Sequence, residues 1–206
     1  MALSAGRIGA ASGILSPVLV VVGFAIHGPF PAEGDSARKI AHYYAVHGGS
    51  ARIWAGGYVE FLGYLAFLPF AAWLWSTLRN AEGEGGWLAA TWLSGAVVFL
   101  AMGLSSFAAF AAALHHGHEL DAQELTTLTA AGSWAYFLSW PAAAVALGGA
   151  AAVALRTGVL PRWLAWLGAL FSLVLLVAVA LRLAGVDALF LAWGAAVGAV
   201  HLRRRA

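Results

Sequence analysis

The sequence predicts an all-α fold, namely a polytopic transmembrane helical bundle with six spans in a single domain over residues 1–206. Of the 206 residues, 62% are hydrophobic and only 10% are charged. An ordinary soluble domain is about 45–50% apolar and about 25% charged. Six apolar segments come close to the roughly 20 residues that cross a bilayer, and basic residues gather on one side of them. This composition excludes a soluble enzyme, a disordered tail and a nucleic-acid-binding protein.

The six predicted spans follow one another closely, which leaves no room for a separate soluble domain. They cover about residues 8–29, 54–78, 87–114, 131–155, 161–181 and 184–201. The apolar run from Ile8 to Phe30 exceeds the 7–15 residues of a signal-peptide core, which favours an uncleaved first span. The last span is the shortest, and its link to the fifth is so brief that the two form a tight hairpin or a short re-entrant pair.

A short amphipathic segment over about residues 35–48 separates the first two spans. Asp35 or Ser36 provides its N-cap, and Gly48 with Gly49 provides its stop. The apolar residues within it recur at roughly helical spacing: Ile40, Tyr43, Tyr44 and Val46. This pattern is typical of a helix that lies on the membrane or caps the mouth of a bundle.

The basic residues predict that both termini are cytoplasmic, because short cytoplasmic loops carry an excess of Lys and Arg. With six spans and an inside N-terminus, seven arginines lie inside: Arg7, Arg79, Arg156, Arg162, Arg203, Arg204 and Arg205. Four basic residues then lie outside: Arg38, Lys39, Arg52 and Arg182. Arg-, Ala- and Gly-rich usage suggests a GC-rich bacterial genome. The expected location is therefore the bacterial inner membrane, crossed several times.

Two G-x-x-x-G motifs lie near the cytoplasmic ends of the first and last spans. Gly9 and Gly13 form one motif, and Gly194 and Gly198 form the other. Such spacing lets helix backbones approach closely in lipid. Intramolecular packing of the two spans and a homo-oligomer seam are both compatible with it.

Glu60 is the most unusual position, because a carboxyl group within an apolar span is costly and marks function by default. At about 1.5 Å per residue it lies roughly 9 Å inside the predicted second span. Three roles stay open: an interhelical hydrogen bond or ion pair, a ligand, ion or catalytic site, and a residue near the headgroups. Tyr64, one helical turn further, shares the face of Glu60.

Most other polar groups of the spans also fall in the predicted outer half, which predicts a cavity open to the outside or to the outer leaflet. The residues expected to line that cavity are Glu60, Tyr64, His27, Ser105, Tyr136 and Arg182. The cytoplasmic half holds almost no ionisable group. A continuous ion path is therefore disfavoured, because a conducting pore needs polar lining along its length.

The segment LHHGHELD contains three histidines within residues 115–118 and offers a candidate metal site. If the segment is helical, His115, His118 and Glu119 share one face, and imidazole with carboxylate suits zinc, copper or nickel. The spacing matches no zincin motif, and a solvated loop is the competing interpretation. There is no cysteine, so disulfides and cysteine-ligated clusters are excluded.

The segment GVLPRWLAWLG at residues 158–168 resembles one that opens the penultimate helix in bacterial six-span membrane proteins of unknown function. The arrangement of Gly34, Asp35, Ser36 and Ala37 after the first span, followed by an amphipathic segment, is similar too. The resemblance implies the six-span layout. It implies no activity and no catalytic residues, because none is established for such proteins.

Three functions are compatible with these features, and the sequence leaves open whether the protein is an enzyme. The favoured one is a binding or accessory protein with an outward-facing cavity for a lipid or another lipophilic ligand. The second is a metal-dependent membrane enzyme that acts at the outer leaflet, and the third is a small transporter. The expected partners are membrane lipid and a lipophilic small molecule, with no nucleic acid.

Overall fold

The computed structural model describes residues 4–181, 183 and 185–204, and every regular element in these ranges is a helix. The helices are α1 (Ala5–His27), α2 (Ala37–His47), α3 (Ala51–Glu82), α4 (Trp87–His116), α5 (Ala122–Thr157), α6 (Arg162–Leu181) and α7 (Ala188–Arg204). The predicted all-α bundle is confirmed.

Five of the described helices, α1, α3, α4, α5 and α6, are long and apolar enough to cross a membrane. The chain is thus a multi-pass membrane protein. α7 is apolar but shorter, with 17 residues, so the sixth span and the cytoplasmic placement of the termini stay predictions. α3 and α5 begin before the predicted spans, because polar first turns extend both helices beyond their apolar stretches.

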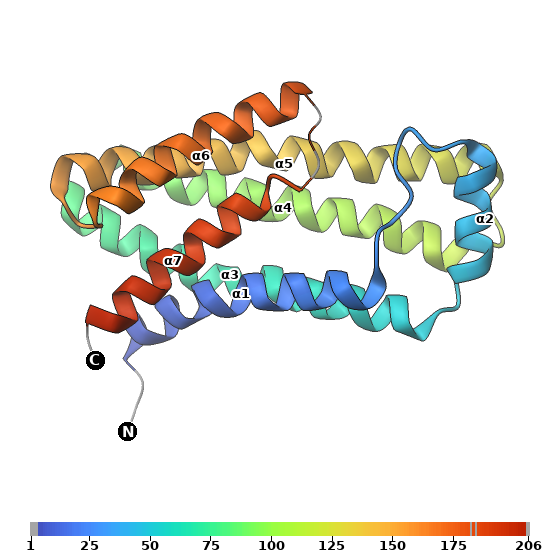
Figure 1. The fold of residues 1–206 in the computed structure, drawn as a ribbon, viewed down its shortest axis with the longest axis horizontal. Helices are drawn as coiled ribbons and strands as arrows, with labels where there is room; N and C mark the ends of the chain where they lie inside the picture. Colours follow the sequence, from blue (N-terminus) through green and yellow to red (C-terminus); the bar gives the residue numbers. More distant parts are fainter. Residues whose placement is uncertain (1–3, 182, 184, 205–206) are drawn as a thin grey trace.

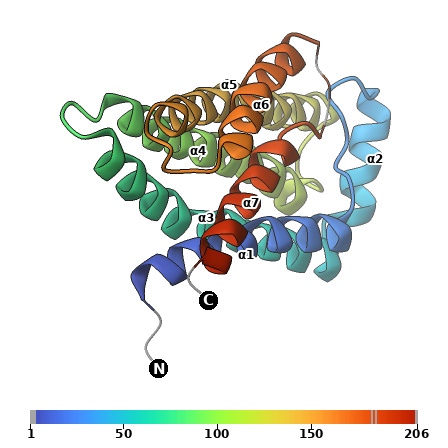
Figure 2. The ribbon, with the colours of Figure 1, turned by 60° about the vertical axis from the view of Figure 1, so that its left-hand side comes forward.

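The bundle consists of two antiparallel helix pairs that lie side by side, α1 with α3 and α4 with α5 (Figure 1). α6 packs along α5, and α7 crosses the face of the bundle from α6 to α1. α2 lies across one end, where it contacts α5 and α4. Both termini lie at the opposite end, as Figures 1 and 2 show. We call the end with the termini the arginine end and the end with α2 the cap end.

The main hydrophobic core lies between the two helix pairs and α7. Large aromatic side chains fill it, among them the fully buried Phe67, Trp92, Phe99 and Phe190. The Trp92 indole N–H donates to the carbonyl of Ala71 over 3.2 Å, which satisfies a donor that no water could reach. This packing joins α3, α4 and α7 into one body.

Glycines bring α1 and α3 into backbone contact. A Cβ added at Gly23 would lie 2.5 Å from the backbone nitrogen of Glu60, and one at Gly56 would lie 2.6 Å from that of His27. No real Cβ tolerates such distances. Small residues at helix interfaces allow this close approach in lipid, where packing replaces the hydrophobic effect.

The G-x-x-x-G motif of the last helix serves packing within the chain. A Cβ at Gly198 would lie 2.3 Å from the carbonyl oxygen of Ala10 in α1, and Gly194 faces the ring of Phe70 in α3. Gly9 and Gly13 face Trp73 and Phe70 instead. The intramolecular interpretation is thus the one that the structure gives.

α2 covers the cap end and has its own small core. Ser36 is its N-cap and accepts from the backbone N–H of Lys39 over 3.4 Å, and the helix ends before Gly48, as predicted. Its inward face consists of Ile40 and Tyr44. Val46 is 61% exposed: Ile40 and Tyr44 are one full turn apart, whereas Val46 lies on another face of the helix.

The Tyr44 hydroxyl fastens α2 to α5 through a buried hydrogen bond of 3.2 Å with Thr129. Burial raises the pKa of Tyr44 to about 12, above its ordinary value of 10.0. A raised tyrosine pKa stabilises the folded state below about pH 10, and this stabilisation is lost as the pH rises towards 12. We therefore expect the thermal midpoint to fall above about pH 10, and less steeply in Tyr44→Phe. Tyr58→Phe is the control, because Tyr58 is 61% exposed; equal profiles for both variants would contradict this role.

Candidate functional site

The centre of the candidate site is a pair between α1 and α3. His27 ends α1, and its Nε2 lies 2.6 Å from the carboxylate Oε2 of Glu60. The side chain of His27 is only 2% exposed and that of Glu60 is 18% exposed. The His27 Nδ1 also hydrogen-bonds to the carbonyl of Gly28. The structure thus shows Glu60 in an interhelical pair, while a ligand, ion or catalytic role and a position near the headgroups stay predictions.

Three further polar side chains surround this pair. Tyr64 is 7% exposed and lies one helical turn from Glu60 in α3, within electrostatic reach of Glu60 and Asp187. Asp187 directly precedes α7 and accepts a hydrogen bond of 2.5 Å from the hydroxyl of Tyr136 in α5. Asp187 and Glu60 are within electrostatic reach of each other. We call His27, Glu60, Tyr64, Tyr136 and Asp187 the polar layer.

The polar layer lies one membrane thickness from the arginine end. The hydrocarbon core is about 30 Å thick, which corresponds to about 20 helical residues. In each of α1, α3 and α5, an arginine near the arginine end is separated from the polar layer by about 20 residues. The three pairs are Arg7 and His27, Arg79 and Glu60, and Arg156 and Tyr136. If these arginines contact headgroups, the polar layer lies at the opposite boundary of the hydrocarbon.

Beyond the polar layer the bundle continues as a cap, formed by residues 28–59, 108–116 and 122–135. The cap has a hydrophobic cluster separate from the main core, and it contains Ile40, Tyr44, Ile53, Ala113, Leu114 and Leu125. Phe30 stacks on Phe110 of α4 with ring centroids 4.7 Å apart and lies 5.0 Å from the ring of His27. The polar layer is thus enclosed between two apolar cores.

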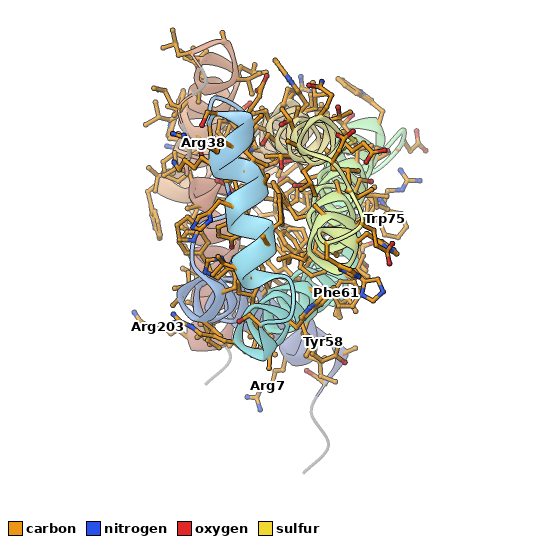
Figure 3. All side chains as sticks on the ribbon, turned by 90° about the vertical axis from the view of Figure 1, so that its right-hand side faces the viewer. Arg7, Arg38, Tyr58, Phe61, Trp75 and Arg203 are labelled. Atoms are coloured by element: carbon orange, nitrogen blue, oxygen red, sulfur yellow. The ribbon has the colours of Figure 1, made fainter. Side chains whose placement is uncertain are left out.

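A groove between α3 and α4 lies on the outside of the bundle at the same level. It has a volume of about 210 Å³ and is lined by Trp54, Tyr58, Phe61 and Phe107. Gly57 lets Phe107 pack closely against α3, since a Cβ there would lie 2.6 Å from the ring of Phe107. Figure 3 looks onto the cap end and shows Tyr58 and Phe61 on the side of α3 that adjoins α4. We call these four aromatic residues the aromatic groove.

Four of the six residues predicted to line one cavity come together in the polar layer: Glu60, Tyr64, His27 and Tyr136. Ser105 does not join them. It is exposed on α4, and its hydroxyl donates to the Ala101 carbonyl of its own helix over 2.8 Å. The prediction for Arg182 falls outside the described residues.

The histidine segment folds differently from the helical arrangement considered for a metal site. α4 ends at His116, so residues 117–120 form a turn and His115, His118 and Glu119 share no helical face. Glu119 instead contacts His116 at 3.0 Å and His118 at 3.4 Å. The hydrogen bond from His116 lowers the pKa of the Glu119 carboxyl. Within the described ranges no group of three or more His, Asp and Glu could hold a metal ion, and zinc or copper binding stays a prediction.

The aromatic groove is the feature that sequence reasoning missed. A tryptophan near the end of a span, such as Trp54, is typical of the interfacial belt and does not by itself indicate a groove. Trp54, Tyr58 and Phe61 do follow an i, i+4, i+7 spacing that places them on one helix face, which is a usable signal. Phe107 gives no such signal, because only the packing of α4 against Gly57 brings it there.

Neither a curated protein nor a solved structure matches the chain. The profile of one protein family, described as "Domain of unknown function (DUF4386)", matches residues 10–202. The match includes α3, α4, α5 and α6, most of α1 and α7, the polar layer and the aromatic groove. It agrees with the resemblance to uncharacterised membrane proteins, and the chain therefore belongs to the DUF4386 family.

Proposed function

We propose that this protein is a binding protein of the bacterial inner membrane that holds a lipophilic ligand in the aromatic groove, on the outer side of the bilayer. The observation that carries this proposal is the groove itself, with four aromatic side chains around about 210 Å³. Aromatic rings bury large areas and have rigid geometry. They are therefore suited to hold an apolar chain in a fixed position.

The dimensions of the groove favour one chain of an amphiphile over a compact molecule. Pockets that enclose drug-sized ligands have volumes of about 300–1,000 Å³, and the groove is smaller and open on one side. Its cap end has polar neighbours, since Trp54 donates its indole N–H to the Gly48 carbonyl and lies against the ring of His115. A polar head beside the cap and a chain along α3 and α4 would match this distribution.

Photo-crosslinking tests the proposal. In vesicles that contain a phospholipid with a photoreactive group in its acyl chain, the main crosslinked peptides should be those with Trp54–Phe61 and Phe107. The double variant Trp54→Ala/Phe107→Ala should lose most of this labelling because it removes two walls of the groove. Trp166→Ala is the matched control, since Trp166 is 65% exposed at the arginine end. Uniform labelling of all lipid-facing helices, unchanged in the double variant, would contradict a specific site.

The metal-dependent enzyme and the transporter stay predictions, as does a homo-oligomer. The polar layer is compatible with chemistry at the membrane boundary, but no described contact favours a reaction there. The intramolecular packing of Gly194 and Gly198 removes the reason to assign that motif to a second copy.

A further inference from the structure

We propose that the His27–Glu60 pair is a proton-binding site that fastens α1 to α3 beneath the cap. This proposal does not depend on a ligand in the aromatic groove. It rests on the hydrogen-bond partners of one imidazole ring, on the backbone contact around that ring and on its place between two apolar cores.

The partners of the imidazole require an additional proton. Nδ1 faces the carbonyl oxygen of Gly28, which only accepts, so Nδ1 must donate. A neutral imidazole carries one N–H, and its Nε2 is then an acceptor. Nε2 nevertheless lies 2.6 Å from a carboxylate oxygen of Glu60. That contact is a hydrogen bond only if a proton lies between the two groups, on His27 as imidazolium or on Glu60 as carboxylic acid.

The surroundings of the pair disfavour the arrangement without this proton, in which a neutral imidazole faces an ionised carboxylate. His27 is 2% exposed, so water cannot separate the two groups without moving a helix. While the pair is intact, Gly23 and Gly56 let the two backbones touch at this level, which leaves no space for water between the helices. An imidazole lone pair against a carboxylate in such a place would lose a hydrogen bond and gain repulsion.

The charged and titratable groups next to the pair come from α3, from α5 and from the start of α7. On α3, Tyr64 interacts with Glu60, and Arg52 donates its Nε–H to the Ile26 carbonyl over 2.6 Å. From α5 and the start of α7, Tyr136 and Asp187 face the pair and bind each other. Asp187 accepts its hydrogen bond from the Tyr136 hydroxyl, so these two side chains are partners of each other.

Release of the proton would weaken the contact between α1 and α3 at the His27–Glu60 pair. In the bound state the pair is either imidazolium with carboxylate or imidazole with carboxylic acid, and both are neutral overall. Release of the proton to water leaves a neutral imidazole and a carboxylate. The single N–H of the imidazole then faces two acceptors, the Gly28 carbonyl and the Glu60 carboxylate. The end of α1 and the segment that carries Phe30 would then lose their contact with α3, and water would reach the polar layer from the cap.

Nitrogen NMR of ring-labelled histidine in nanodiscs, combined with infrared spectroscopy, tests the proton directly. At neutral pH we expect either an imidazolium signal that is absent in His27→Gln, or a carboxylic acid band that is absent in Glu60→Gln. Glu60→Gln should convert His27 to the neutral ring with N–H at Nδ1, because the amide can donate to Nε2. His118→Gln is the control, as that side chain is 76% exposed. A neutral His27 beside an ionised Glu60 in the native protein would overturn the proposal.

Thiol labelling of an introduced cysteine tests whether the pair fastens α1 to α3. The sequence contains no cysteine, so only the introduced thiol is labelled. Ser106 in α4 is only 6% exposed, so Ser106→Cys is labelled by a water-soluble reagent only when water enters the interior of the bundle. Its labelling rate is divided by the rate in Ser106→Cys/Glu60→Gln at the same pH, which removes the titration of the thiol. We expect this ratio to be about tenfold higher in alkaline than in acidic buffer, equivalent to about 1.4 kcal/mol. A flat ratio would contradict the fastening role.

Discussion

Replacing Gly56 by alanine is expected to destabilise the bundle more than any other single methyl group added to a glycine of the cap. The new Cβ would lie 2.6 Å from the backbone nitrogen of His27 and 2.9 Å from the carbonyl oxygen of Gly23. Backbone atoms cannot rotate away as a side chain can, so α1 must move from α3. Overpacking of this kind costs about 3 kcal/mol.

Unfolding in mixed detergent micelles, followed by far-UV circular dichroism, measures this cost. Gly49→Ala is the matched control, because a Cβ at Gly49 meets no atom within 4 Å. If Gly56→Ala and Gly49→Ala unfold at the same detergent fraction, the backbone contact between α1 and α3 does not exist in the protein.

Replacing His27 by leucine is expected to destabilise the bundle by about 3 kcal/mol, because it leaves the Glu60 carboxyl, which is only 18% exposed, without the imidazole at 2.6 Å. The double variant His27→Leu/Glu60→Met should recover much of that loss, since it replaces the pair by apolar side chains of similar size. We therefore expect both the native protein and the double variant to be more stable to unfolding than the single variant His27→Leu.

The same unfolding assay tests this order. The pair of His116 and Glu119 is the control, since both side chains are more than half exposed and exposed pairs contribute little. His116→Leu should thus leave the unfolding transition nearly unchanged. A double variant less stable than His27→Leu would contradict the view that the loss arises from an unpaired carboxylate.

The membrane class and most helix positions were predictable because they depend on composition and on apolar length alone. α4 and α6 agree with the predicted spans to within two residues at each end. α5 differs most, because it begins at Ala122, with Asp121 as its N-cap. Its first turns form a polar helix outside the apolar stretch, and hydropathy does not detect them.

The polar layer was predictable in part. A carboxyl group within an apolar span needs a partner, which singled out Glu60, and the placement of His27 at the same end of the bundle made it a candidate. The partnership of Asp187 with Tyr136 was not predictable, because it depends on α7 beginning inside the bundle. The same reasoning misplaced Ser105, since helix rotation decides whether a serine faces the interior or the lipid.

The central claim is that the aromatic groove holds a lipophilic ligand, and native mass spectrometry of the protein released from nanodiscs tests it most directly. The native protein is expected to retain one lipophilic molecule per chain after delipidating detergent washes. Trp54→Ala/Phe107→Ala should lose it, while Trp166→Ala should keep it. A native protein that is free of ligand after the same washes, or equal retention in all three proteins, would contradict the claim.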